Sequence, residues 1–186
     1  DGNITDVIAL SGTGFTPAGL DVTPNAGLAF GSLQTGTTSG AMTATVTNTG
    51  GQTANNLSVA ISGDFSDITD NCSATSLNSG ASCTVDVTFS PQTDGMKTGT
   101  LTTTADGGLI DAINLTGTGF TSAGLDVTPD AGLNFGISQT GSSSGTMTAT
   151  VTNTGGQTAS NLSIVFTGDF SAMSDNCSGT SLAGGG

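Results

Sequence analysis

The chain has 186 residues, a formal net charge of −13 and a single basic residue, Lys97. Nucleic acids and anionic membrane surfaces are bound through Lys and Arg side chains, so this composition argues against both as partners. Only 8% of the residues are charged, and every acid is Asp, so solubility must rest on Ser, Thr, Asn and Gly. No run of 18 apolar residues occurs, so no membrane insertion is expected within this stretch.

The chain contains an internal repeat. Residues 42–54, MTATVTNTGGQTA, return letter for letter at residues 147–159, an offset of 105. Between residues 16–81 and residues 121–186, about 46 of 66 aligned positions are identical. Self-similarity at a fixed offset is the signature of a repeat protein.

The repeat predicts three parts in chain order. Residues 1–15 resemble residues 106–120 and are expected to be the closing strand of a preceding unit. Residues 16–120 form one complete unit, and residues 121–186 form the first part of a following unit. We expect the chain to be one part of a longer array of such units. The alternative is a complete subunit whose partial units are finished by neighbouring chains.

Within the complete unit, apolar and polar residues alternate almost throughout. This period is typical of strands that bury one face and expose the other. It predicts a first strand broken at Pro24–Gly27, and the remaining strands follow at 42–47, 57–62, 83–89, 98–104 and from Leu109. Nothing has a helical period. The fold class is therefore all-β, with tandem immunoglobulin-like antiparallel β-sandwiches of about seven strands per unit.

Several motifs resemble a known family. They are the Val-Thr-Asn-Thr-Gly run at 46–50, Gly-Asp-Phe-Ser at 63–66, Gly-Ala-Ser-Cys-Thr-Val-Asp-Val-Thr-Phe-Ser-Pro at 80–91 and Leu-Thr-Gly-Thr-Gly at 115–119. Together they resemble the ASH-type immunoglobulin-like domains of the abnormal-spindle and Hydin family. The resemblance is closer still to the tandem bacterial surface versions called choice-of-anchor D proteins. It implies a seven-stranded sandwich in an exported protein and no catalytic residues.

The three cysteines are best explained by the repeat. Cys72 and Cys83 lie in the complete unit, whereas Cys177 matches Cys72 and its partner would fall at position 188, beyond the chain end. We expect a Cys72–Cys83 disulfide and hence an oxidising compartment. The rival interpretations are a metal site and a thiol nucleophile. Both are disfavoured, because the chain has no His and the spacing is not that of a zinc site.

One acidic cluster is a weak candidate for calcium. Asp64, Asp67 and Asp70 lie within residues 63–70, and Ca²⁺ prefers carboxylate oxygens. The second copy loses the middle acid, and the spacing is not that of an EF-hand. A solvated loop, or Asp residues that cap turns, is the favoured interpretation. No metal and no cofactor are therefore expected.

Three functions remain in order of preference. The first is a structural segment of an extracellular or cell-surface bacterial fibre or stalk, whose partners are copies of itself, as adjacent repeats or neighbouring subunits. The second is an adhesin that recognises a sugar or protein through its loops. An enzyme comes last, because no general base with a pKa near neutrality is evident. Whether a fibre would be one covalent array or short subunits joined by strand exchange through residues 1–15 stays open.

Overall fold

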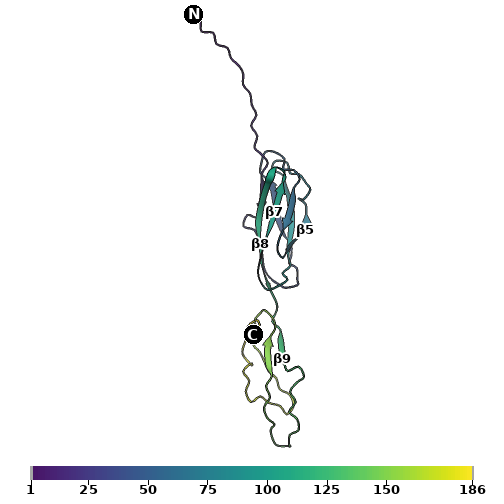
Figure 1. Ribbon diagram of the computed structural model, residues 1–186. Coiled ribbons are helices and arrows are strands. Elements are labelled where there is room, and N and C mark those ends of the chain that lie inside the picture. The colour runs from purple at the N-terminus through teal and green to yellow at the C-terminus, as the bar shows by residue number, and fades with distance from the viewer. Residues whose placement is uncertain (1, 186) are drawn as a thin grey trace. The chain divides into compact units, whose positions relative to one another are not determined.

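The computed structural model describes residues 2–185 (Figure 1). Apart from one 3-10 turn at Asp106–Gly108, every regular element in these residues is a strand. No helix among them is long and apolar enough to cross a membrane. Strands β1 to β8 and strands β9 and β10 are described separately below. The predicted all-β class is confirmed.

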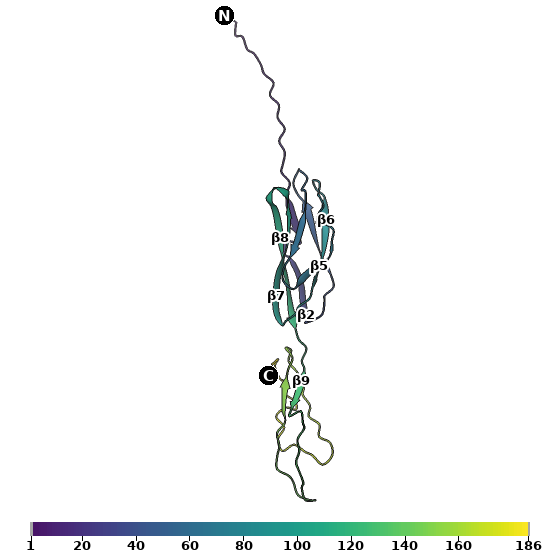
Figure 2. The ribbon, with the colours of Figure 1, turned by 45° about the vertical axis from the view of Figure 1, so that its right-hand side comes forward.

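Strands β1 to β8 form two sheets. The first sheet has the order β1-β3-β6-β5, and its neighbouring strands pair antiparallel. The second has the order β2-β8-β7-β4 (Figure 2). The bounds are β1 Leu20–Thr23, β2 Leu28–Gln34, β3 Met42–Asn48, β4 Ser58–Ile61, β5 Phe65–Asp70, β6 Ser82–Phe89, β7 Gly95–Ala105 and β8 Leu109–Phe120.

The core lies between the two sheets and is built from alternate residues of most of the strands. Its fully or nearly fully buried side chains include Val22, Ala44, Val46, Val85, Val87, Phe89, Leu101, Ile113 and Leu115. Three phenylalanines cluster within it. The ring centroid of Phe65 lies 4.9 Å from that of Phe89 and 5.5 Å from that of Phe30. Aromatic rings at such distances stabilise a core beyond the area that they bury.

The predicted broken first strand is in fact two strands in different sheets. β1 pairs with β3, whereas β2 lies beside β8. The chain changes sheet at the turn in which Gly27 N–H donates to the Pro24 carbonyl (2.8 Å). Gly27 has a φ of +83°, and a Cβ there would collide with the carbonyl oxygen of Asn114. Glycine is therefore required where the chain crosses the core.

The solvated loop expected at residues 63–70 is largely a strand, although Asp70 caps a turn, as the alternative interpretation expected. Residues 65–70 form β5, which pairs with β6 from Phe65 opposite Phe89 to Asp70 opposite Val85. The register shifts between Asp67 and Thr69. A β-bulge of this kind breaks the two-residue alternation, so the strand carries no periodic signal in the sequence.

Asn48 ends β3 with a fully buried side chain. Its Nδ2 donates to the carbonyls of Gln52 (2.7 Å) and Leu77 (2.8 Å). Its Oδ1 accepts from the N–H groups of Gly19 (3.2 Å) and Gly50 (3.0 Å). All four hydrogen-bonding positions of the amide are filled. One side chain therefore joins the entry to β1, the turn after β3 and the loop before β6.

Thr103, in β7 opposite Val59 of β4, is fully buried. Its Oγ1 is the single buried side-chain nitrogen or oxygen atom without a hydrogen-bond partner among the residues that the structure describes. Burying an unpaired hydroxyl costs free energy, because the group loses its hydrogen bonds to water on folding and gains none within the protein.

Residues 121–185 contain two strands, β9 Leu125–Thr128 and β10 Thr150–Asn153. They pair antiparallel, with Val151 opposite Val127, as Val46 lies opposite Val22 in the first copy. An isolated bridge joins Ala159 to Leu182, as another joins Ala54 to Leu77. Residues 2–15, predicted as a closing strand, form no strand and are exposed.

We predict that Asn48→Asp lowers the free energy of unfolding by about 3 kcal/mol or more at pH 7, because it buries a charge and turns two donor contacts into repulsion between oxygens. Urea denaturation measures this loss. The matched control is Asn55→Asp, which introduces the same charge at an exposed position and should change stability by less than about 0.5 kcal/mol. Equal losses in the two variants would contradict the role assigned to Asn48.

We predict that Thr103→Val stabilises the sandwich by about 1 kcal/mol, because it removes an unsatisfied buried hydroxyl at constant volume. The thermal midpoint of the variant should rise accordingly. Thr104→Val makes the same change at an exposed position of the same strand and should have little effect. A destabilised Thr103→Val variant would show that the hydroxyl has a partner in solution.

Candidate functional site

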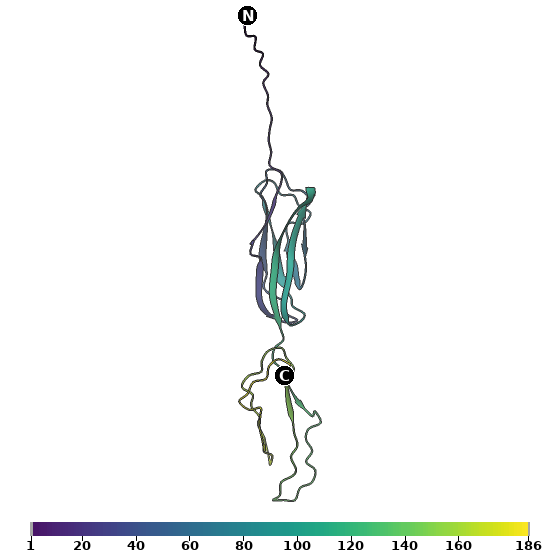
Figure 3. The ribbon, with the colours of Figure 1, turned by 60° about the vertical axis from the view of Figure 1, so that its left-hand side comes forward.

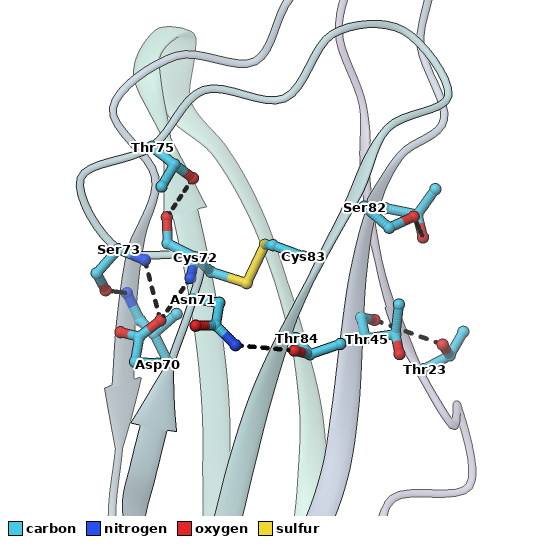
Figure 4. The surroundings of a disulfide bond; sticks show 12 residues. Thr23, Thr45, Asp70, Asn71, Cys72, Ser73, Thr75, Ser82, Cys83 and Thr84 are labelled. Atoms are coloured by element: carbon cyan, nitrogen blue, oxygen red, sulfur yellow. Dashed lines mark hydrogen bonds between the residues drawn. A yellow bond between two sulfur atoms is a disulfide. The ribbon is translucent and has the colours of Figure 1, made fainter.

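The predicted disulfide joins the end of β5 to the start of β6. Cys72 follows β5 and is fully buried, and Cys83 is the second residue of β6. Their sulfurs are bonded and their Cα atoms lie 5.3 Å apart (Figure 4). The link closes a loop in which the two cysteines are 11 residues apart, and it contributes about 2–3 kcal/mol by restricting the unfolded chain.

Asp70 shapes the turn that carries Cys72. Its Oδ1 accepts hydrogen bonds from the N–H groups of Cys72 (2.8 Å) and Ser73 (2.9 Å). Dashed lines in Figure 4 mark both bonds. The Thr75 hydroxyl closes the turn by donating to the Cys72 carbonyl (2.6 Å). Such an Asx turn is the usual role of an Asp that ends a strand.

The same turn is fastened to the first residues of the neighbouring β4 segment. The Val59 N–H donates to Ser73 Oγ (3.1 Å), and the Ala74 N–H donates to the Leu57 carbonyl (2.8 Å). Ala74 has a φ of +60°, in the left-handed region that favours glycine. The second copy has Gly179 at this position, with a φ of +73°.

The second copy builds the same turn without a disulfide. Asp175 Oδ1 accepts from the N–H groups of Cys177 (2.8 Å) and Ser178 (2.9 Å), and the Ile164 N–H donates to Ser178 Oγ (3.1 Å). Cys177 is a half-buried free thiol. The turn is therefore a local structure that presents its cysteine, and the disulfide is not needed to form it.

Hydrogen bonding perturbs the acidity of Asp70. Partial burial raises its pKa, but hydrogen bonds from the Ser73 side chain and from the Ser73 and Cys72 backbone outweigh this, so the pKa lies below the ordinary 3.8. In Asp175 the pKa is lowered chiefly by the Ser178 side chain and then by the Ser178 and Cys177 backbone. The ionised carboxylates are the forms that hold these turns.

The structure does not bring the calcium candidates together. Asp64 precedes β5, Asp67 lies within it and Asp70 ends it. Six residues of extended chain span about 20 Å, so the three carboxylates cannot share one ion. Within residues 2–185, no three His, Cys, Asp or Glu side chains are grouped as metal ligands.

The complete copy also has a wide, open hollow. It has a volume of about 340 Å³ and is lined by Phe15, Pro17, Ala18, Gln52, Thr53, Asp106, Gly107 and Leu109. Asp106 is its one charged side chain, and it already accepts from Asn56 Nδ2 (2.6 Å). Phe15, Pro17, Ala18 and Leu109 make part of this lining apolar.

Sequence reasoning missed Asn48 and Ala74. The signal for Asn48 was present, because Asn48 and Asn153 occupy the same place in the identical 13-residue stretch. The signal for Ala74 was that the second copy has Gly179 at this position, between two turn residues that are identical in both copies. Such an exchange is typical of a position with positive φ.

We predict that Asp70→Asn is less stable than the parent chain at pH 7 and that this difference shrinks as the pH falls below about 4. The sign follows from the lowered pKa. The ionised form stabilises the fold above the unfolded pKa, and this contribution is lost as the pH falls through the folded pKa. Urea midpoints between pH 2.5 and pH 7 measure the effect. The control is Asp67→Asn, which removes a carboxylate at an exposed strand position. The pH dependence of its stability reports the titration of the other carboxylates. A difference independent of pH would contradict this account.

Comparison with solved structures finds low similarity. The PapD-like domain 7 of human CEP192, an ASH domain, is 16% identical, with 63% of this chain and 97% of that chain covered and a TM-score of 0.43. The secreted serine protease VesC from Vibrio cholerae is 19% identical, with coverages of 57% and 24% and a TM-score of 0.44. The class 5 fimbriae chaperone CfaA is 11% identical, with coverages of 89% and 82% and a TM-score of 0.36.

None of the curated proteins matches the chain. The family assignment rests on a family model described as "Abnormal spindle-like microcephaly-assoc'd, ASPM-SPD-2-Hydin", which matches residues 20–113, half of the chain. This range begins at β1 and ends within β8. It therefore takes in both sheets, the Asn48 side chain and the Cys72–Cys83 disulfide. The chain belongs to the ASH family of immunoglobulin-like domains.

Proposed function

We propose that the chain is a spacer segment of a bacterial cell-surface or extracellular fibre or stalk, of the choice-of-anchor D kind, whose partners are copies of the same unit. The observation that carries this proposal is the repetition of one structural unit. The hydrogen bonds of Asn48 recur at Asn153, and those of Asp70 recur at Asp175. Only residues 121–124 separate β8 from β9.

The surface of the first sheet supports a packing role. Its outward-facing hydroxyls bond across the strands, either to another hydroxyl, as Thr47 Oγ1 does with Ser82 Oγ (2.8 Å), or to a carboxylate, as Thr43 Oγ1 does with Asp86 Oδ1 (2.6 Å). Paired hydroxyls with few charges let sheets approach each other at little cost in desolvation. This surface suits lateral contacts between like units.

The disulfide supports an exported location. Structural disulfides persist in oxidising compartments and are rare in the cytosol. Cys72, which is fully buried, is bonded to the half-buried Cys83, and the link would also limit local opening and hence proteolysis. We infer that the protein works outside the cytoplasm.

We predict that antibodies against residues 16–120 label intact native cells or shed filaments at a regular spacing by immunogold electron microscopy. Mass spectrometry of the same material, alkylated before reduction, should find Cys72 and Cys83 joined. Permeabilised cells are the control. Labelling only after permeabilisation, with both thiols alkylated, would contradict the proposal. Binding of a glycan or protein by isolated residues 16–120, without filaments, would favour an adhesin.

A further inference from the structure

The sandwich of β1 to β8 has edge strands at both ends of each sheet. β1 and β5 end the first sheet, and β2 and β4 end the second. The outer backbone groups of an edge strand are a template for pairing with a strand of another molecule. A repetitive chain is especially exposed to such mispairing, because it supplies many like strands. The Leu-Asp-Val-Thr sequence of β1 recurs unchanged in β9.

The outer N–H group of Val22, in the β1 edge, is already bonded. Because the Thr49 N–H donates to the Gly19 carbonyl (3.0 Å), the alternation of an antiparallel pair turns the Val22 N–H away from β3. The Val22 N–H donates instead to Oδ2 of Asp111 (2.6 Å). Asp111 belongs to β8, which lies between β2 and β7 in the second sheet (Figure 3). A side chain of one sheet thus caps the edge of the other.

Asp111 occupies a position that would suit an apolar residue. It alternates with Leu109, Ile113 and Leu115 in the row of β8 that faces the core, and Ile113 and Leu115 are buried. Among the residues of β2, β4, β7 and β8 it is the single acid. A half-buried carboxylate costs free energy unless hydrogen bonds compensate it. Inward-pointing charges are one of the means by which proteins block the edges of their sheets.

The other three edges are interrupted in different ways. At β4 the Val59 N–H donates to Ser73 Oγ (3.1 Å), in the turn that follows β5. β5 itself carries the bulge between Asp67 and Thr69. β2 contains Gly31 with a φ of +69°, outside the range of an extended strand. Each edge therefore departs from the regular row of free groups that a second strand needs.

We propose that the Asp111 carboxylate is an edge cap, which keeps the β1 strand of a second copy from pairing with β1. The N–H groups of Leu20 and Val22 face outward from this short strand, and the cap occupies that of Val22. Without the cap, two copies of β1 could pair antiparallel about a twofold axis, since each would offer the other the same groups. The inference concerns the unit itself, so failure of the proposed fibre role would leave it standing.

The test replaces Asp111 in the full chain. Asp111→Leu removes the acceptor and places an apolar side chain in an apolar row, so the variant should fold. At low protein concentration its Val22 amide should exchange with deuterium about tenfold faster than in the parent chain, because the N–H has lost its partner. As the concentration rises, sedimentation velocity should show a dimer that the parent chain does not form, and the Val22 amide should regain its protection. Asp111→Ala is the second variant, with the same expected results.

Two matched controls separate the cap from its charge. Asp111→Asn keeps an acceptor oxygen, so the Val22 amide should stay protected and the oligomeric state should be that of the parent chain. Asp21→Asn removes one negative charge from β1 without touching the Val22 bond, and it should also behave as the parent does. The proposal is overturned if Val22 exchanges equally fast in the Asp111→Leu variant and the parent chain. It is also overturned if Asp111→Leu associates no more strongly than Asp111→Asn.

Discussion

The Asn48 side chain is the constraint on which the rest of the unit depends. Its amide joins Gly19, Gly50, Gln52 and Leu77, four backbone positions that lie on three separate stretches of chain. A buried polar group that is fully paired adds specificity, because any other arrangement of those stretches leaves donors or acceptors without partners. The path of the chain into β1 and out of β3 is therefore fixed by one residue.

The second copy shows that this constraint is local. Asn153 Nδ2 donates to the carbonyls of Gln157 (2.7 Å) and Leu182 (3.0 Å), and its Oδ1 accepts from Gly155 N–H (3.1 Å). These bonds form although β10 pairs only with β9. The Asn network and the Asp175 turn are therefore independent of the inner strands, whereas extended strand structure at residues 147–149 is not.

The sequence allowed the fold class, most strands and the disulfide to be predicted, because alternation and repetition are direct consequences of a half-buried sheet. It did not reveal β5, since a bulge at residues 67–69 removes the alternation. Nor did it reveal the change of sheet at Gly27, which depends on contact with Asn114, far away in the chain. The pairing of Asp70 with backbone N–H groups followed from turn chemistry, whereas the dispersal of Asp64 and Asp67 along β5 required the structure.

Ala74 makes its turn in the first copy less stable than the corresponding turn in the second copy. Its left-handed backbone costs about 1 kcal/mol relative to glycine, and the corresponding Gly179 avoids this cost. In the fibre proposed above, small differences of this kind between nearly identical modules would set the order in which the modules unfold under load. A row of them would open one after another when pulled, and each rupture would dissipate work and spare its neighbours.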